Sequence, residues 1–349
     1  MSATLSDVAA RAGVAISAAS RVLSRAPATR VRPETRERIE GAARDLGYRP
    51  NFAGRALKLA RSDVLAMIVP DLTNPLFSEL LRGVDEAATE HDYLMLLGRS
   101  EDVGGDMIGR LIGEGRVDGV LLQTGDDTRG EDVTELLRSD APVIFINSVE
   151  AGHAGSVTLP NSAAAAAATR HLLELGHTKI GLVGGLPTVF TSDAREAGFR
   201  EALTRAAVPV RKTWLTRLGY TAAQGRQALR KLWRLKRRPT GVVVANLNAA
   251  IGVLAEARAL GISVPDDLSV VAVHDAWTAD HTSPALTTVR MPMYDLGRAA
   301  VELLLDKLRG AEVANTMIEQ PEPVLVFRAS TAAPPIPDRR PDDVDLTGE

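Results

Sequence analysis

The sequence has 349 residues, which is long enough for two or three domains that each bury a hydrophobic core. It contains no cysteine, so a disulfide framework and a thiolate metal site are both excluded. The formal net charge of −3 is divided unevenly, because residues 1–61 hold 12 basic and 5 acidic side chains, a net +7, and the remainder therefore carries −10. A basic segment joined to an acidic body is typical of a protein that binds a polyanion such as DNA or RNA.

Targeting and metal-binding signals are absent from the sequence. The first residues contain no apolar run of signal-peptide length, and no stretch approaches about 18 consecutive apolar residues. We therefore expect a cytoplasmic protein. The six histidines are scattered and form no His-x-x-x-His motif, and no paired-acid motif accompanies them. The sequence predicts no catalytic residues, no metal site and no cofactor.

Residues 1–48 are predicted to form three short helices. Thr4 stands three residues ahead of Asp7, which is typical of a capping box, and Gly13 ends the first helix. A second helix runs through residues 16–23, and a third begins at Pro33. The side chains predicted to form their small core are Val8, Ala9, Ala12, Val14, Ala19 and Val22. Two short helices about a glycine turn predict a helix-turn-helix.

The strings TLSDVAARAGVAISAASRVL and VRPETRERIEGAARDLGYRPN closely resemble the headpiece of the lactose-repressor and purine-repressor (LacI/GalR) family of bacterial transcription regulators. The resemblance continues along nearly the whole chain. It implies that the second helix lies in the major groove of DNA, with Ile16, Ser17 and Arg21 at the base-reading positions. The chemistry agrees, since Arg21 can bond bidentately to guanine and Ile16 can touch a thymine methyl group. The alternative for Arg21 is a solvated surface charge.

The same resemblance implies further DNA contacts and a hinge at residues 49–62. The additional DNA-binding positions are Thr4, Ser20, Arg30, Asn51, Arg55 and Leu57. In the family the hinge is a short helix that orders on DNA and pairs with its twin from a second subunit, which would place Leu57 in the minor groove as a wedge. Gly54 costs this helix about 1 kcal/mol of propensity. Alternatively, residues 49–62 are a plain linker and Leu57 packs against the body.

Residues 63–330 alternate apolar runs with amphipathic helical stretches. The runs predicted as strands are 64–70, 93–97, 117–123, 142–147, 179–185, 241–246 and 268–275. Continuous apolar runs separated by helices predict parallel, doubly wound sheets. The expected fold is thus an all-α helix-turn-helix headpiece plus an α/β two-lobe body, which the resemblance implies is periplasmic-binding-protein-like, with the chain crossing between lobes near Pro160, Pro292 and Pro321.

Two further segments are predicted to be a solvated helix face and a disordered tail. The run KLWRLKRR (231–238) carries five basic side chains near a helix end, and it is predicted to be a solvated face. Residues 331–349 are rich in proline and aspartate and lack a leucine heptad, so they are predicted to be a disordered tail that forms no coiled coil.

A small ligand binds such folds beyond the carboxyl ends of the strands, in the cleft between lobes. The candidate effector contacts at these ends, which are also the family's positions, are Leu72, Asn74, Phe77, Arg99, Gln123, Asn147, Thr191, Arg195, Tyr220, Asn246, His274 and Met291. Arg195 offers two parallel donors to a carboxylate, a phosphate or a diol. The alternatives are an ion pair of Arg195 with Asp193, core packing for Phe77 and Tyr220, and a satisfied buried imidazole for His274.

The candidate effector site has few carboxylates. Sugar-responsive members of the family commonly have aspartate where His274 stands and often where Asn147 stands, and an Asn-Asp pair here reads Asn246-Leu247. Carboxylates suit sugars because each oxygen accepts a hydrogen bond from a hydroxyl group. We therefore hypothesise an effector with an anionic group or reduced hydroxyl content.

These observations predict a sequence-specific DNA-binding transcription regulator, a repressor, that binds a pseudo-palindromic operator as an effector-controlled homodimer. Two alternatives belong to other classes. A solute-binding protein would carry an export signal and no basic headpiece. A doubly wound enzyme would need a nucleophile beside His274-Asp275 or a cofactor fingerprint after a strand, and the sequence contains neither.

Overall fold

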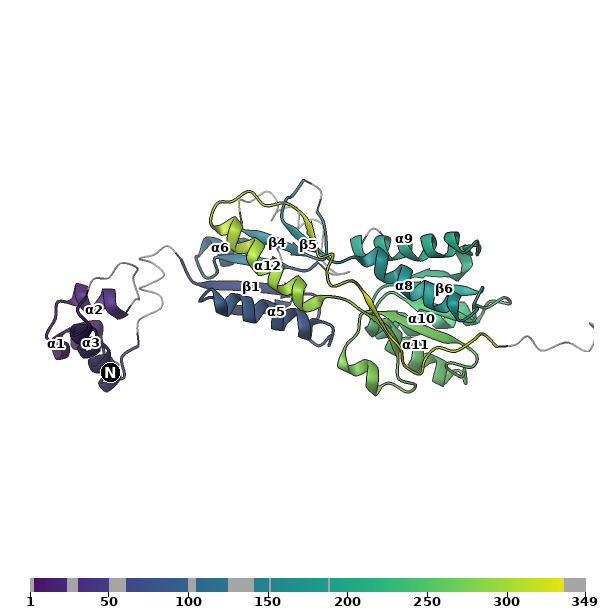
Figure 1. Ribbon diagram of the computed structural model, residues 1–349, viewed down its shortest axis with the longest axis horizontal. Helices are drawn as coiled ribbons and strands as arrows, with labels where there is room; N and C mark the ends of the chain where they lie inside the picture. The colour runs from purple at the N-terminus through teal and green to yellow at the C-terminus, as the bar shows by residue number, and fades with distance from the viewer. Residues whose placement is uncertain are drawn as a thin grey trace, which may run out of the picture. The chain divides into compact units, whose positions relative to one another are not determined.

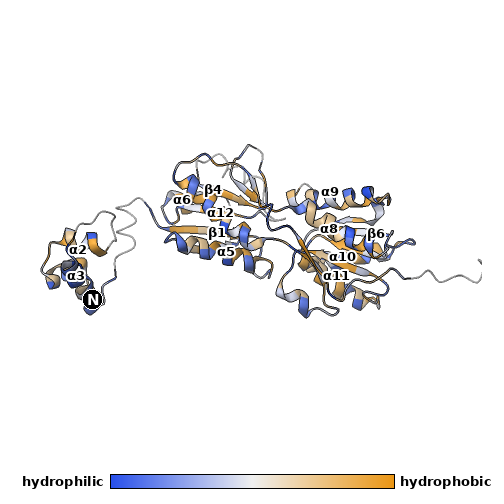
Figure 2. Cartoon of the chain, viewed as in Figure 1, coloured by the Kyte–Doolittle hydropathy of each residue, from blue (hydrophilic) through white to orange (hydrophobic). Residues whose placement is uncertain are grey.

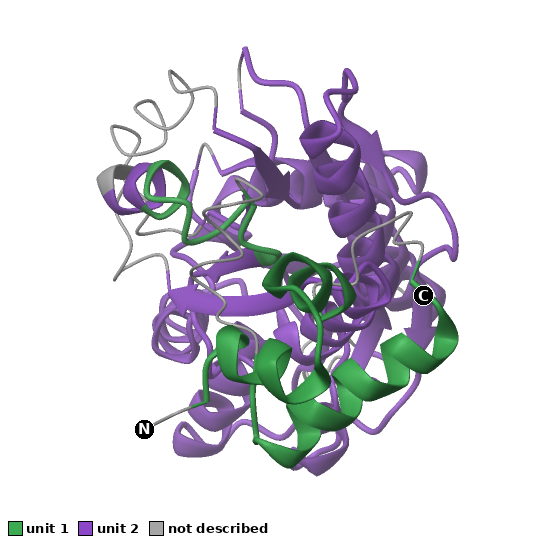
Figure 3. Cartoon of the chain, turned by 90° about the vertical axis from the view of Figure 1, so that its left-hand side faces the viewer, with its two compact units in different colours: residues 1–64, 111–118 green, residues 65–110, 119–349 purple. Residues whose placement is uncertain are grey.

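The computed structural model describes residues 3–23, 31–49, 61–99, 105–124, 141–150, 152–187 and 189–335. The chain divides into two compact units, residues 1–64 with 111–118 and residues 65–110 with 119–349, which are coloured green and purple in Figure 3. The first unit contains the helical headpiece. The second contains almost all of the α/β body.

The headpiece consists of α1 (Leu5–Ala12), α2 (Ile16–Leu23) and α3 (Pro33–Asp45) (Figure 1). The predicted capping box is present, because the Thr4 hydroxyl accepts from the Asp7 amide while the Asp7 carboxylate accepts from the Thr4 amide at 2.8 Å. Gly13 ends α1 in the left-handed conformation with φ 63°. The buried core is Val8, Ala9, Ala12, Ala19, Val22, Ile39, Ala42 and Ala43, with Val14 packed at its edge. The three predicted helices are confirmed.

The first lobe of the body is built on a six-stranded sheet with the order β11-β5-β4-β3-β1-β2. Its strands are β1 (Val64–Val69), β2 (Leu94–Arg99), β3 (Gly119–Leu122), β4 (Val143–Ile146), β5 (Ser156–Thr158) and β11 (Thr316–Met317). The helices that accompany them are α5 (Phe77–Glu90), α6 (Gly105–Gly113) and α12 (Met293–Leu308). The strand β3 pairs in parallel with both β1 and β4, as the continuous apolar runs predict.

The second lobe repeats this plan with the sheet order β12-β10-β9-β8-β6-β7. Its strands are β6 (Ile180–Gly184), β7 (Leu215–Arg217), β8 (Gly241–Val244), β9 (Ser269–Val273), β10 (Thr287–Arg290) and β12 (Val324–Val326). Its helices are α8 (Asn161–Glu174), α9 (Phe190–Arg205), α10 (Ala222–Trp233) and α11 (Leu247–Ala259), with short 3₁₀ turns η1 (Lys212–Trp214) and η2 (Trp277–His281). Strands are predominantly apolar and the helices amphipathic (Figure 2). The two-lobe α/β fold is confirmed.

The chain passes between the lobes at the three predicted prolines. Pro160 separates β5 from α8, and α8 packs on strands β8, β9, β10 and β12 of the second lobe. Pro292 precedes α12, which returns to pack on β3, β4 and β5 of the first lobe. Pro321 lies between β11 and β12. Each lobe is therefore assembled from segments that are far apart in the sequence.

Helices in both lobes meet through reciprocal glycines. In the first lobe, a β-carbon on Gly83 of α5 would clash with the Tyr294 carbonyl of α12, and one on Gly297 of α12 with the Leu80 carbonyl of α5. The second lobe has the same arrangement between α10 and α11. There Gly225 faces the Ala249 carbonyl and Gly252 faces the Ala222 carbonyl. These four positions require glycine because backbone atoms of the neighbouring helix occupy the space of a side chain.

The ordered body extends beyond residue 330, where the disordered tail was predicted to begin. The Thr331 hydroxyl lies 2.9 Å from Nε2 of His171, and the Ala332 carbonyl accepts from Nε2 of His177 at 2.9 Å. The Ser269 hydroxyl also donates to the Ala332 carbonyl, at 3.0 Å. The predicted boundary is therefore wrong for residues 331–335, because buried polar groups of the body hold this segment. Residues 336–349 lie outside the described residues.

Candidate functional site

The outward face of α2 carries the three residues predicted to read DNA bases. The helix buries Ala19 and Val22 and exposes Ile16, Ser17 and Arg21, as predicted. Ile16 is 52% exposed. The Arg21 side chain folds back on the helix, where its Nε donates to the Ser17 carbonyl at 3.2 Å. This helix therefore presents one apolar, one hydroxyl and one guanidinium group on a surface away from the core.

The other predicted DNA-binding residues are differently placed. Thr4 caps α1 with its hydroxyl, and the Asp7 carboxylate that it binds has a pKa below its usual range because of the Thr4 hydrogen bonds. Ser20 is half-buried on α2. Arg30, Asn51, Arg55 and Leu57 lie outside the described residues, and so does most of the predicted hinge.

At the carboxyl ends of the strands, Arg195 is the centre of a buried polar cluster. This residue lies in the second turn of α9 and is only 4% exposed. Nη1 donates to the Ala245 carbonyl at 2.6 Å, while Nε and Nη2 donate to Oδ1 of Asn161 at 3.0 and 2.8 Å. The predicted alternative, an ion pair with Asp193, is not formed. Within the part of the chain that the structure describes, no carboxylate pairs with Arg195.

Asn161 links Arg195 to the first lobe. Its Oδ1 accepts from Arg195, and its Nδ2 donates to Oδ1 of Asn147 at 2.7 Å. Asn147 follows β4, and its Oδ1 also accepts from the Leu159 amide at 3.2 Å. Asn161 was not among the predicted contacts, because it begins a helix and the short strand β5 before it was not predicted. The polar Asn161 between Pro160 and an alanine run was the available signal.

His274, directly after β9, completes the cluster. Nη2 of Arg195 donates to Nε2 of His274 at 2.6 Å. Since a guanidinium has only donors, Nε2 must be the accepting nitrogen and the proton of the neutral imidazole is on Nδ1. Burial, together with the charge of Arg195, holds the pKa of His274 well below its usual value, so the ring is neutral. Its Nδ1 is buried and has no hydrogen-bond partner among the described residues.

Two more buried polar atoms at the carboxyl ends of strands have no partner among the described residues. They are Oε1 of Gln123, which follows β3, and the hydroxyl oxygen of Ser148, which follows Asn147. A buried polar atom without a partner costs about 1–3 kcal/mol unless a water or a ligand binds it. Gln123 was a predicted contact, and Ser148 was not. Together with Nδ1 of His274, these atoms are buried polar groups without hydrogen-bond partners at the carboxyl ends of β3, β4 and β9.

Asn147 and His274 occupy equivalent places in the two lobes. Each is the first residue after a central strand, and each has a positive φ, 51° for Asn147 and 68° for His274. Residues other than glycine adopt this left-handed backbone conformation at a free-energy cost of about 1–2 kcal/mol. Strained residues of this kind cluster at binding sites. The backbone therefore marks the same two positions as the polar contacts.

Tyr220, Thr191 and Asn246 form the remaining polar contacts near Arg195. The Tyr220 and Thr191 hydroxyls lie 2.9 Å apart, and the Arg195 guanidinium carbon is 5.6 Å from the centre of the Tyr220 ring. Asn246 caps α11, because its Oδ1 accepts from the Ala249 amide at 2.8 Å. Its Nδ2 donates to the Tyr220 carbonyl at 3.0 Å. The amide of Asn246 is thus already engaged in fixing the local backbone.

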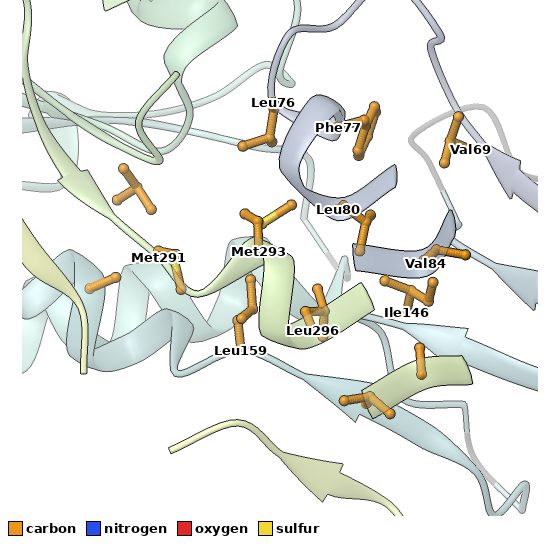
Figure 4. Close-up of a cluster of buried hydrophobic side chains, with 14 of the residues drawn as sticks. Val69, Leu76, Phe77, Leu80, Val84, Ile146, Leu159, Met291, Met293 and Leu296 are labelled. Carbon is orange, nitrogen blue, oxygen red and sulfur yellow. The ribbon is translucent and has the colours of Figure 1, made fainter. Parts of the chain in front are cut away.

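The other predicted effector contacts lie in different environments. Phe77 and Met291 are buried among the hydrophobic side chains of the body (Figure 4), which is the environment that the core-packing alternative expects for Phe77. Oδ1 of Asn74 accepts a hydrogen bond from the Leu76 amide at 3.1 Å, in the turn that precedes α5. Leu72 and Arg99 are exposed, and Arg99 ends the edge strand β2.

The described residues contain no group of three or more histidines, cysteines, aspartates or glutamates that could hold a metal ion. A membrane-spanning segment is likewise not found, since none of the described helices has the length and apolar character to cross a bilayer.

Comparison with known proteins agrees with this architecture along the chain. Residues 4–51 match the bacterial regulatory proteins of the lacI family, and residues 169–331 match a periplasmic binding protein-like domain. Catabolite control protein A of Priestia megaterium is 32% identical over 336 residues, which cover 95% of this chain and 100% of that protein. The transcriptional repressor CytR of Escherichia coli K12 is 33% identical over 337 residues, covering 95% and 97%.

A solved structure extends the similarity to three dimensions. The lac repressor dimer bound to operator and the anti-inducer ONPF matches with a TM-score of 0.81 and 25% identity, over 95% of this chain and 100% of that chain. Regulatory relatives that match over their whole length exclude the enzyme and solute-binding alternatives. The headpiece, the two-lobe body and these relatives show that the chain belongs to the lacI family of bacterial regulatory proteins, whose members are DNA-binding transcription regulators and not enzymes.

Proposed function

We propose that the protein is a cytoplasmic repressor that binds a pseudo-palindromic operator as a homodimer and is controlled by a small anionic effector. The similarity to the repressor CytR over 95% of the chain supports the repressor assignment. The lac repressor structure, a dimer on operator DNA, supports the mode of assembly. The observation that carries the effector class is the buried guanidinium of Arg195, which has no carboxylate partner among the described residues.

The headpiece reads DNA through the exposed face of α2. Arg21 selects a guanine, Ile16 contacts a thymine methyl group, and Ser17 makes a versatile polar contact. Contacts to phosphates and the minor groove come from Thr4, Ser20, Arg30, Asn51, Arg55 and Leu57. The twofold symmetry of a homodimer explains why the operator is pseudo-palindromic, because the same helix then meets each half-site.

The homodimer covers the edge strand β2. Leu94, Leu96 and Leu97 on this strand are 66%, 44% and 43% exposed. Edge strands that expose a row of large apolar side chains are aggregation sites unless another chain covers them. A second copy that packs on β2 buries these leucines, and it brings two headpieces to one operator.

The effector binds at the carboxyl ends of the strands and supplies hydrogen-bond acceptors. A buried charge is costly unless it is paired, and the neutral partners of Arg195 leave its positive charge uncompensated. His274 adds a second donor, because the proton on its Nδ1 has no acceptor among the described residues. A carboxylate or phosphate satisfies both groups, whereas a neutral sugar satisfies only the hydrogen bonds. The remaining proposed contacts are Leu72, Asn74, Phe77, Arg99, Gln123, Asn147, Thr191, Tyr220, Asn246 and Met291.

Effector and operator influence each other through the body. A ligand that touches both lobes changes the angle between them, and this alters the spacing of the two hinges in the dimer. By linkage, the operator must then change the affinity for the effector by the same factor as the effector changes the affinity for the operator.

Matched pairs of small molecules test the effector class. The melting temperature of the full chain is measured with gluconate against glucose, and with glucose 6-phosphate against glucose. An acidic member should stabilise the protein while its neutral parent does not. Arg195→Lys should abolish this shift, and the matched control Arg200→Lys on the same helix, whose side chain pairs with Glu196, should retain it. Equal stabilisation by glucose would contradict an anionic effector.

Selection from random double-stranded DNA tests the operator separately. The full chain should enrich a sequence with twofold symmetry, and enrichment of no sequence would contradict the repressor assignment irrespective of the effector result.

A further inference from the structure

The loops that precede β6, β7 and β8 carry a dense group of basic side chains. Because these strands are parallel, their amino ends lie at one edge of the second-lobe sheet, opposite to the edge that contains Arg195 and His274. Seven lysine and arginine side chains belong to this group, and all of them are exposed. We name this group the basic surface, and its members are Lys179, Arg211, Lys212, Arg234, Lys236, Arg237 and Arg238.

Tertiary contacts bring the three loops of the basic surface together. Nε1 of Trp214 donates to the Arg237 carbonyl at 3.0 Å, which joins the loops before β7 and β8. The Thr240 amide donates to the Lys179 carbonyl at 2.7 Å and so adds the loop before β6. Two guanidinium groups lie over indole rings, Arg211 at 5.1 Å from the Trp214 centre and Arg238 at 4.7 Å from the Trp233 centre. The surface is therefore a structured one.

The basic surface lacks acidic partners. Several arginines elsewhere on this lobe do pair with carboxylates, for example Arg200 and Arg217 with Glu196, and Arg226 and Arg230 with Glu256. No member of the basic surface forms an ion pair with a carboxylate of the described residues. The loop before β9 does contain Asp266 and Asp267, but their carboxylates accept hydrogen bonds from Ser263. Seven neighbouring positive charges repel one another and attract an anionic partner.

The last described part of the chain is held at the same edge. The Ala332 carbonyl is bound by His177, whose Nδ1 lies 2.9 Å from the Thr240 hydroxyl in the loop before β8. Pro334 lies against Gly176, since a β-carbon on that glycine would be 3.7 Å from the proline ring. Figure 1 shows this yellow segment running along the second lobe. Residue 336 therefore follows directly from the edge that carries the basic surface.

Residues 336–349, IPDRRPDDVDLTGE, have the complementary charge. They contain five acidic residues and two arginines, a net −3, and all the charges after Arg340 are negative. These acidic residues are Asp342, Asp343, Asp345 and Glu349. Fourteen extended residues span about 45 Å, so the length of the segment does not limit its reach.

From these observations we infer that residues 336–349 bind the basic surface of their own chain. This contact lowers the positive charge of this edge of the second lobe, which would otherwise attract nucleic acid without regard to sequence. It confines DNA binding to the headpiece. The attachment at Ala332 keeps the acidic segment close to its binding surface, and this high effective concentration favours a contact within one chain.

Carbodiimide cross-linking of the full chain tests the contact directly, because the reagent joins a carboxylate to a lysine only where the two touch. The six lysines of the sequence are Lys58, Lys179, Lys212, Lys231, Lys236 and Lys307. We expect peptides that join Asp342, Asp343 or Asp345 to Lys179, Lys212 or Lys236, and we expect these products to disappear at about 1 M salt. Lys307, which donates to the Val143 carbonyl in the first lobe, is the internal control.

Mixing ¹⁵N-labelled with unlabelled protein distinguishes the possible sources of the acidic segment. Cross-links confined to one isotope support the contact within a chain. Cross-links between isotopes would assign the segment to a second copy and overturn the inference, as would their absence from the basic surface.

Heparin binding supplies an independent readout of the same surface. A chain shortened after Pro335 should bind heparin roughly tenfold more tightly than the full chain at low salt, because its basic surface is uncovered. Combining this truncation with Lys236→Glu and Arg237→Glu should remove the gain. Equal affinities of the full and shortened chains would show that residues 336–349 do not compete with heparin for the basic surface, and the inference would then be wrong.

Discussion

Nε2 of His274 accepts a hydrogen bond from Nη2 of Arg195 over 2.6 Å, and both side chains are buried at the carboxyl end of the second-lobe sheet. Burial and the nearby cation lower the pKa of His274 and so keep the imidazole neutral, and the hydrogen bond from Arg195 fixes its tautomer. A neutral ring with its proton on Nδ1 is a donor on its other side. The hydrogen bond from Arg195 therefore leaves the Nδ1 proton of His274 available to an acceptor.

The first prediction concerns pH. Burial lowers the pKa of His171 and His177, and burial and Arg195 lower that of His274, so all three rings are neutral when folded. The unfolded chain binds protons at these rings near pH 6.5. The free energy of unfolding should therefore be independent of them above about pH 7.5 and should decrease as the pH falls below about 6.5. Urea denaturation at several pH values measures this decrease, and His274→Gln should make it shallower. An identical pH dependence in this variant would contradict a buried neutral His274.

The second prediction concerns ligand selectivity. His274→Asp should give Arg195 a carboxylate partner, so an anionic ligand would lose its attraction and meet a like charge. The affinity for an acidic ligand identified by melting-temperature screening should fall by about 2 kcal/mol or more. Calorimetric titration checks this value. His281→Asp, at a histidine that bonds to the Trp277 carbonyl, is the control and should bind as the unmodified chain does.

The third prediction concerns base recognition. Arg21→Ala should relax the preference at one base pair of each half-site and cost about 1–3 kcal/mol of specific affinity. Repeating the operator selection with the variant measures this change. Arg36→Ala on α3, whose partner Glu40 is 3.9 Å away, should leave the base preference as it was. If the base preference is unchanged in Arg21→Ala, Arg21 is a solvated surface charge and does not read a base.

The fourth prediction concerns assembly. Leu96→Lys together with Leu97→Lys should weaken the homodimer, because each buried leucine contributes about 1.5–3 kcal/mol to such an interface. Sedimentation velocity over a range of concentrations checks the dissociation. Leu260→Lys, at a leucine of similar exposure that lies on the second lobe, should sediment like the unmodified protein. Dimers that resist the double substitution would place the interface elsewhere.

The fifth prediction concerns the close helix pair in the second lobe. Gly225→Ala should destabilise the body by about 1–3 kcal/mol, because its β-carbon clashes with the Ala249 carbonyl of α11. Gly41→Ala in α3 meets no atom within 4 Å and should instead stabilise its helix by about 0.5–1 kcal/mol. Thermal unfolding of both variants gives the two signs. A stabilised Gly225→Ala protein would mean that α10 and α11 can separate freely.

The sequence predicted the elements that have long apolar runs or distinct caps. The helices of the headpiece and seven strands of the body belong to this group. The strands β5, β7, β10, β11 and β12 were not predicted, because they have only two to four residues and so lack a long apolar run. Their places depend on neighbouring strands, which supply the hydrogen bonds.

The candidate site was predictable only in part. Arg195, Asn147 and His274 could be found because each follows or faces a strand end. Asn161 could not be found in this way, since its role arises where the chain crosses between lobes and meets both Asn147 and Arg195. Met291 follows β10 and was predicted to bind, and the structure buries it among hydrophobic side chains, two residues before α12 begins.

Asn147 and His274 share a left-handed backbone conformation, which costs the folded protein stability at both positions. Glycine would adopt the same backbone without strain and so would favour the folded protein on that account. It would also remove the amide that binds Asn161 and the imidazole that binds Arg195. Selection for thermal tolerance alone would therefore tend to erode these two strand ends. A side chain at either position therefore costs backbone stability and supplies a contact of the polar cluster around Arg195.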